Sequence, residues 1–177
     1  VAWSDPAQAV EQALISDDMS VSESNSLHIV NDNDIVLVLK YETGKYQVDF
    51  SLHLAENMGG YYNLQQIFDN GSDANVWGHQ VEFFAGGQGH MSIDQWATSE
   101  TFEYTDGEWI KCSQTIDIDN DTASLTIDDV LVYEWQWSVP QGGGGNASID
   151  GINFYGKSDA PPGNDYYVDD IKIYKIE

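Results

Sequence analysis

The sequence predicts an all-β protein, a sandwich of two antiparallel sheets built from short strands. Apolar and polar residues alternate along most of the chain, which is the period of a strand with one buried face. Gly, Asn, Asp and Ser gather between these segments, as they do in tight turns. Helical periodicity is confined to Pro6–Leu14, where Asp5 can cap a short helix. Many short strands almost without helices are typical of sandwich folds.

Twelve segments have the composition and alternation of strands. In chain order they are Leu27–Ile29, Ile35–Lys40, Lys45–Leu54, Gly60–Phe68, Gly78–Phe84, His90–Ile93, Thr101–Tyr104, Trp109–Ile118, Ala123–Ile127, Val130–Trp137, Ile149–Tyr155 and Tyr166–Ile176. Three turns between them are well marked, at Thr43–Gly44, Asp119–Asp121 and Asp128–Asp129. The glycine run Gln141–Asn146 predicts a loop.

Length and charge narrow the possible partners. A chain of 177 residues suits one domain, and it has no apolar run long enough to span a membrane. Its net charge is −24, with 30 acidic residues against 6 basic ones, all of them lysine. Nucleic acid and anionic lipid require clustered Lys or Arg, so we expect no nucleic-acid partner and no membrane insertion. Neutral or cationic ligands fit this charge better.

Cys112 and the opening residues bear on core packing and on export, and not on a candidate site. A single cysteine forms no internal disulfide, and its apolar neighbours predict that Cys112 fills a small space in the core. The opening VAWSDPAQAVEQ lacks the features of a signal peptide, so we expect any export signal to lie outside these residues.

Six segments, in their order along the chain, resemble a jelly-roll domain of the concanavalin A-like type. They are ALISDDMSVSESNSLHI, GKYQVDFSLHL, GGYYNLQQ, TIDIDNDTASLTIDDVLVYEWQWS, GINFYG and YYVDDIKI. The resemblance covers nearly the whole chain and implies one domain over residues 1–177. It further implies an accessory module, similar to carbohydrate-binding modules, of a larger bacterial protein that is secreted or displayed at the cell surface. Most such modules are non-catalytic.

Strand alternation assigns a set of polar and aromatic side chains to one open sheet face. The candidates are Tyr61, Asn63 and Gln65 on one strand, Gln80 and Glu82 on the next, and Asn153 and Tyr155 on a third. Amides pair with vicinal hydroxyls, and aromatic rings stack on the C–H face of a pyranose. These residues predict a concave face that binds a neutral polysaccharide. The alternative is a merely solvated polar face.

The strand Val130–Trp137 offers two sets of side chains to that face. Trp135 and Trp137 point to one side, and Glu134 and Gln136 to the other. We take the two tryptophans as ligand-binding candidates, while burial in the core remains the alternative. Further aromatic candidates at the rim and in loops are Trp77, His79 and Trp96.

A calcium site follows from the resemblance. In related jelly rolls a structural calcium ties the N-terminal segment to the last strand through aspartate. The matching residues are Asp17 and Asp18, together with Asp169 and Asp170. Carboxylate oxygens are the ligands that calcium prefers, and a cation bound only by the folded state stabilises it.

Catalytic motifs are sparse. Glu82 and Glu134 could face each other as a glycosidase pair, but no E-x-D-x-x-E, H-E-x-x-H or G-x-S-x-G run occurs. We therefore predict a non-catalytic carbohydrate-binding module. Two alternatives stay open: a protein-facing adhesin or spacer, and a jelly-roll glycoside hydrolase or lyase.

Overall fold

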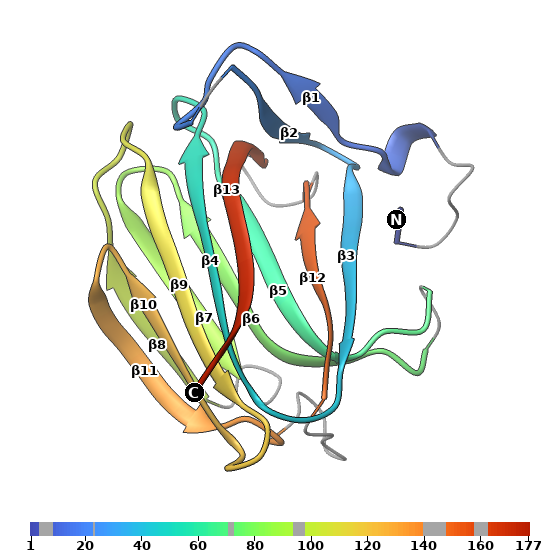
Figure 1. Ribbon diagram of the computed structural model, residues 1–177. Coiled ribbons are helices and arrows are strands. Elements are labelled where there is room, and N and C mark those ends of the chain that lie inside the picture. The colour runs from blue at the N-terminus through green and yellow to red at the C-terminus, as the bar shows by residue number, and fades with distance from the viewer. Residues whose placement is uncertain (4–8, 23, 71–72, 94–97, 140–147, 158–162) are drawn as a thin grey trace.

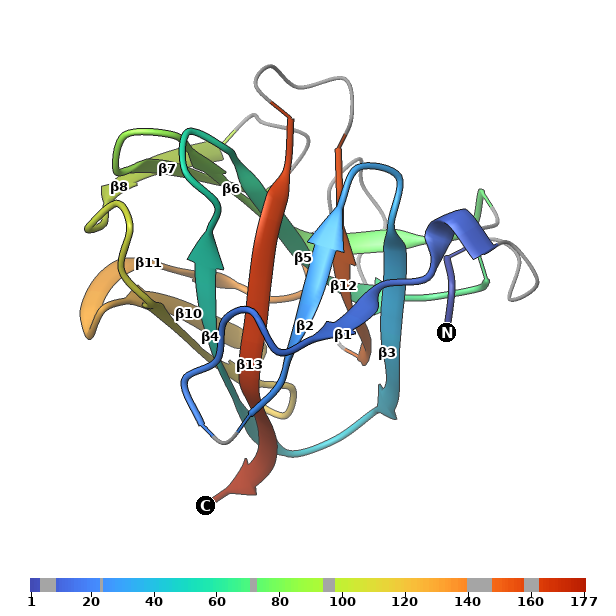
Figure 2. The same cartoon turned by 90° about the horizontal axis from the view of Figure 1, so that it is seen from above.

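Two antiparallel sheets pack face to face (Figures 1 and 2). The structure is a computed structural model that describes residues 1–3, 9–22, 24–70, 73–93, 98–139, 148–157 and 163–177. The seven-stranded sheet has the order β1 (Leu14–Ser16), β2 (Ser26–Val30), β13 (Asp165–Ile176), β4 (Lys45–Leu54), β9 (Ile110–Asp117), β10 (Thr122–Ile127) and β11 (Val130–Gln136). The six-stranded sheet has the order β3 (Asp34–Tyr41), β12 (Ile149–Tyr155), β5 (Gly60–Ile67), β6 (Val76–Phe84), β7 (Gln88–Ile93) and β8 (Thr98–Glu103). The predicted fold class is confirmed.

The twelve predicted strands are all present, and β1 is a further strand that the sequence did not indicate. Within the described part of the predicted helix only the 3₁₀ turn Ala9–Glu11 is helical and Leu14 begins β1, while residues 4–8 lie outside the described part of the chain. The turn at Asp128 and Asp129 joins β10 to β11 with φ angles of 49° and 63°, the left-handed pair that a two-residue hairpin requires. Trp96 and the glycine run 141–146 also lie outside the described residues.

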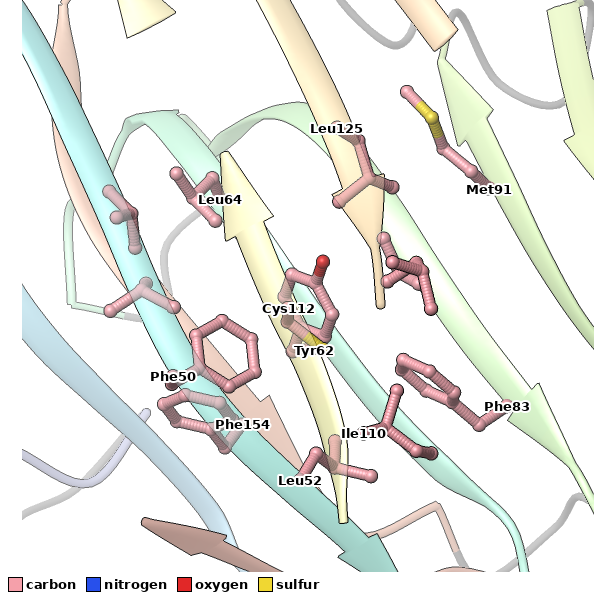
Figure 3. Close-up of a cluster of buried hydrophobic side chains, with 14 of the residues drawn as sticks. Phe50, Leu52, Tyr62, Leu64, Phe83, Met91, Ile110, Cys112, Leu125 and Phe154 are labelled. Carbon is pink, nitrogen blue, oxygen red and sulfur yellow. The ribbon is translucent and has the colours of Figure 1, made fainter. Parts of the chain in front are cut away.

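The core lies between the sheets and follows from the alternation of the strands (Figure 3). Phe50 of β4 meets the rings of Tyr62 (β5) and Phe154 (β12) edge to face, with centroids 4.9 and 5.3 Å apart. Burying each such side chain contributes about 1.5–3 kcal/mol. Cys112 is fully buried among them, as predicted.

Strands β3, β12, β5 and β6 are consecutive neighbours, and their register aligns the side chains of the outer face. Asn63 pairs with Gln80 on one side and with Asn153 on the other. The chain start runs along β3, because Ala2 bridges Ile35. The described part of the chain holds no apolar helix of the length that a bilayer requires.

Candidate ligand-binding site

A hollow of about 310 Å³ opens on the outer face of the six-stranded sheet. Its residues come from four neighbouring strands and from two flanking segments. They are Asp34 (β3), Asn153 and Tyr155 (β12), Tyr61 and Asn63 (β5), Trp77 and Gln80 (β6), with Trp3 and Lys157 at the sides. The next residues along these strands, such as Tyr62 and Phe154, are buried on the inner face. The hollow therefore belongs to the open face that alternation predicts.

A row of side-chain hydrogen bonds crosses this hollow from strand to strand. Asn153 Nδ2 donates to Asp34 Oδ1 (2.7 Å), and Asn63 Nδ2 donates to Asn153 Oδ1 (2.8 Å) and to Tyr61 Oη (3.1 Å). Tyr61 Oη donates in turn to Gln80 Oε1 at 2.5 Å. Each amide is held in one orientation by its neighbours, so the polar groups are fixed before a ligand arrives.

One atom in this row lacks a partner. Asn63 is only 1% exposed, and its Oδ1 has no hydrogen bond within the described residues. A buried acceptor without a partner costs about 1–3 kcal/mol. Because Asn63 lines the hollow, a donor on a bound molecule can remove that cost.

Aromatic rings form the walls. Trp3 and Trp77 are stacked with ring centroids 6.0 Å apart and planes 19° from parallel. Tyr61 and Tyr155 meet edge to face at 6.1 Å. Flat apolar surface beside fixed hydrogen-bonding groups is the combination that a pyranose ring uses.

A bulge in β6 brings Trp77 to this wall. His79 pairs with Leu64 and Trp77 with Gln65, so Gly78 lies between them without a partner on β5. A Cβ at Gly78 would lie 2.2 Å from the Trp137 ring, which shows that Gly78 faces the interior as His79 does. Two consecutive inward residues reverse the alternation, and Trp77 therefore points outward.

Two charged side chains line the hollow, and among the described residues Lys157 has an ion-pair partner whereas Asp34 has none. Lys157 Nζ lies 2.6 Å from Glu82 Oε1 and 5.4 Å from the centre of the Tyr61 ring. Asp34 has no cation within ion-pair distance among the described residues. Burial raises the pKa of the Asp34 carboxyl to about 7, the hydrogen bond from Asn153 opposes this, and the charge of Glu11 adds to it. Burial also raises the pKa of Tyr61, so its hydroxyl stays protonated.

Three predicted binders lie elsewhere, which corrects the expectation about β11. This strand belongs to the seven-stranded sheet, so neither of its sides reaches the hollow (Figure 1). Trp135 and Trp137 are 8% and 0% exposed and pack in the core. His79 is not at the rim: it is fully buried between the sheets, with ring centroids 5.2 Å from Trp135 and 6.2 Å from Trp137.

This interior region is unusually polar. Both ring nitrogens of His79, the whole amide of Gln114 and Trp135 Nε1 are buried without a partner among the described residues. Burial lowers the pKa of His79 to about 3, and the adjacent Gln114 side chain opposes that shift only in part. His79 is therefore neutral near pH 7.

Two further candidates have placements of their own. Gln65 is fully buried without a hydrogen-bond partner in the described chain, and it does not line the hollow. Glu82 lies on the outer face beside Tyr61, where it forms an ion pair with Lys157.

The other predicted candidates, Tyr61, Asn63, Trp77, Gln80, Asn153 and Tyr155, meet in the hollow. The sequence did not indicate Trp3, Asp34 or Lys157. Asp34 faces Tyr155 in the β3–β12 register, a pairing that alternation alone does not provide. Trp3 and Lys157 lie outside the strands and gave no periodic signal.

Two of the four predicted calcium residues, Asp169 and Asp170, contact the N-terminal segment. Asp169 Oδ2 accepts hydrogen bonds from the backbone amides of Val21 (2.7 Å) and Ser22 (3.1 Å), and Asp170 Oδ1 accepts one from Ser22 Oγ (2.8 Å). These bonds join the N-terminal segment to β13 directly. Asp18 instead accepts a hydrogen bond from Ser16 Oγ.

No group of three or more His, Cys, Asp or Glu suited to a metal occurs in the described ranges, where Asp17 and Asp18 also lie. The oxygens of Asp169 are already used by amide donors. Calcium at this place stays a prediction.

A second hollow, of about 460 Å³, lies on the seven-stranded sheet. Its polar residues include Thr115, Asp121, Ser124, Glu134 and Gln136. Trp135 also lines this second hollow, but the stacked pair of Trp3 and Trp77 and the row of hydrogen-bonded amides belong to the first, so the second hollow provides matched control positions.

Comparison with known proteins concerns the fold. Neither protein-family models nor curated proteins match the sequence. Among solved structures the chain is similar to a sialidase (13% identity, TM-score 0.62), covering 93% of this chain and 16% of that one. It is also similar to Trypanosoma rangeli sialidase in complex with the inhibitor DANA (11% identity, TM-score 0.61; 93% and 27% covered). Sheep galectin-11 in complex with glycerol matches over 80% of this chain and 98% of its own (9% identity, TM-score 0.55).

These likenesses place the chain in the jelly-roll sandwich architecture that galectins share with a part of sialidases. The chain spans less than a fifth of the sialidase that it matches at 13% identity.

Proposed function

We propose that this chain is a non-catalytic module that binds carbohydrate in the hollow between β3, β12, β5 and β6. The observation that carries the proposal is the side chain of Asn63, which lines a hollow walled by aromatic rings and whose buried Oδ1 accepts no hydrogen bond from the described residues. The fold shared with galectins supports it.

The ligand would be held by two kinds of contact. A sugar hydroxyl would donate to Asn63 Oδ1, while Gln80, fixed by the hydroxyl of Tyr61, would present its amide NH₂ to a second hydroxyl. Trp77 and Tyr155 would cover the apolar face of the ring. Acidic sugars are disfavoured because the hollow contains Asp34 and its one lysine is paired.

Affinity electrophoresis against a panel of soluble neutral polysaccharides tests this function. We expect one of them to retard the wild-type protein, and Trp77→Ala and Gln80→Ala to abolish the retardation. Gln136→Ala, in the second hollow, is the matched control and should be retarded like the wild type. Absence of retardation across the panel would favour the protein-facing alternative, whereas retention of binding in both hollow variants would show that carbohydrate binds outside this hollow.

One observation favours a second candidate, a glycoside hydrolase or lyase. The carboxyl of Asp34 lies in the hollow with its pKa near 7, as a general acid or base requires. Glu82 and Glu134 lie on different sheets and cannot act together as a glycosidase pair. Release of reducing ends from the retained polysaccharide, lost in Asp34→Asn, would establish catalysis; binding without product would exclude it.

The proposal also concerns the cellular location of the protein and the domains beside it. We expect the module to work outside the cell, attached to other domains of a larger polypeptide that act on the same carbohydrate. Finding the chain in a cytoplasmic fraction would contradict this setting.

A further inference from the structure

The hollow contains one carboxylate that the protein does not neutralise. Asp34 Oδ1 accepts a hydrogen bond from Asn153, but none of the described lysines, histidines or the N-terminal amine forms an ion pair with Asp34. Lys157, which also lines the hollow, is bound to Glu82 at 2.6 Å. A half-buried carboxylate with amide partners alone is poorly compensated, and a positive group on a ligand would complete it.

The surroundings of Asp34 do not supply that charge from any neighbouring strand. Tyr155 faces it on β12, and Tyr61 lies along the same row on β5. Glu11, in the turn before β1, adds a second negative charge. The local potential is therefore negative at the end of the hollow formed by β3.

The whole molecule has the same sign. A net charge of −24 without arginine attracts cations and repels uronic or sulfated sugars at long range. Beyond this general attraction, the position of Asp34 beside Asn63 and Asn153 places one carboxylate within the row that would read sugar hydroxyls. A charge at that place can distinguish an amine from a hydroxyl or an acetamide at one position of the sugar.

We infer that the hollow selects an amino sugar whose amine is free and protonated, with Asp34 as the partner of the ammonium group. This inference rests on the proposed carbohydrate function and narrows its ligand class. The volume of about 310 Å³ suits one end or a short stretch of such a saccharide. An N-acetylated sugar would leave Asp34 uncompensated and would be bound less tightly.

The test compares two oligosaccharides that differ only in acetylation: a glucosamine oligomer and the N-acetylglucosamine oligomer of equal length. Calorimetric titration near about pH 7 keeps a share of both the free amine and the Asp34 carboxyl in their charged forms, and an ammonium group beside the carboxyl favours its ionised form. A charge-assisted hydrogen bond contributes about 1.5–3 kcal/mol, so we expect the wild type to prefer the free-amine oligomer by roughly tenfold to a hundredfold.

Asp34→Asn keeps the acceptor for Asn153 and removes the charge. We expect this variant to lose the preference while its weaker affinity for the acetylated oligomer is unchanged. Glu134→Gln removes one charge from the other sheet and should keep the preference. Asp34→Ser serves if the amide variant does not fold, as judged by its melting curve.

The outcomes separate the two proposals. Equal or tighter binding of the acetylated oligomer by the wild type overturns the inference and leaves the carbohydrate function standing. A preference that survives in Asp34→Asn and disappears in high salt is attraction by net charge alone, and it also overturns the inference. Absence of binding to these oligomers and to the whole neutral panel overturns the proposed function itself.

Discussion

Asp34 and His79 are two titratable residues whose burial disturbs them in opposite directions. Burial raises the pKa of Asp34 to about 7 from its ordinary 3.8 and lowers the pKa of His79 to about 3 from 6.5. Asp34 lines the candidate site, while His79 lies in the core. Both residues change the stability of the fold over a shared range of about pH 4 to pH 6.5, so single variants are needed to separate their effects.

For Asp34, the folded protein holds more protons than the unfolded chain between about pH 4 and pH 7. Stability contributed by the protonated carboxyl is therefore lost as the pH rises through this range. We expect Asp34→Asn to match the wild type near about pH 4 and to be more stable by on the order of 1–3 kcal/mol near about pH 8. Urea denaturation at both pH values measures this.

Glu134→Gln, an exposed change on the other sheet, is the control for this experiment and should show no such pH-dependent gain. Equal stability of Asp34→Asn and wild type at the higher pH would mean that the carboxylate is well solvated, and the inferred need for a cationic partner would weaken.

For His79 the sign is reversed. Between about pH 3 and pH 6.5 the unfolded chain binds the extra proton, so stability falls as the pH is lowered through that range. Lowering the pH from about 7 to about 5 should remove about 2 kcal/mol through this residue. His79→Leu, which keeps an apolar side chain in the core, should remove this acid sensitivity in denaturation experiments. An unchanged pH dependence in the variant would assign the loss to other groups.

At the scale of elements, the bulge in β6 links the core to the site. Gly78 has no room for a methyl group beside Trp137, and its place in the bulge turns Trp77 outward. We expect Gly78→Ala to destabilise the fold by about 1–3 kcal/mol through overpacking. Thermal denaturation measures the loss, and carbohydrate retention of the folded fraction measures the displacement of Trp77.

The double variant Gly78→Ala/Trp137→Phe makes this prediction specific. A smaller ring opposite the new methyl group should restore part of the stability lost in Gly78→Ala. If the double variant is less stable than the sum of its parts, the contact between these two residues is not the cause.

The join between the N-terminal segment and β13 carries the calcium prediction. Val21 and Ser22 already donate hydrogen bonds to Asp169 across this join. If a cation adds to it, a chelator should lower the melting temperature, and added calcium should restore it by mass action. In Asp169→Asn the response to the chelator should vanish. An identical melting temperature with and without chelator would leave the hydrogen bonds as the whole of the join.

The alternation of polar and apolar residues predicts on which face of its own strand a side chain lies. It does not predict which strands become neighbours. It placed Asn63, Gln80 and Asn153 on one face, because each has an apolar neighbour that must be buried. It does not indicate which sheet β11 joins, so it does not distinguish the buried tryptophans Trp135 and Trp137 from ligand-binding ones. That choice depends on contacts between distant segments, which a periodic pattern does not contain.

The whole molecule is dominated by uncompensated negative charge. The net charge of −24 repels itself more strongly in the folded protein than in the expanded chain. Salt screens such repulsion, with a Debye length of about 10 Å at 0.1 M and about 3 Å at 1 M. We expect the melting temperature to rise as sodium chloride is added over this range. A constant or falling melting temperature would show that specific ion pairs, such as Lys157 with Glu82, outweigh the general repulsion.

Strand β13 sits between β2 and β4 near the middle of its sheet, although it is the last strand in the sequence. During synthesis on the ribosome the seven-stranded sheet therefore stays open, with the edges of β2 and β4 unpaired, until β13 has left the exit tunnel. Until then, the unpaired edges of β2 and β4 expose nascent chains of this protein to association with one another. Their many acidic residues keep them apart in that interval, and chaperone binding is expected to end only when β13 is inserted.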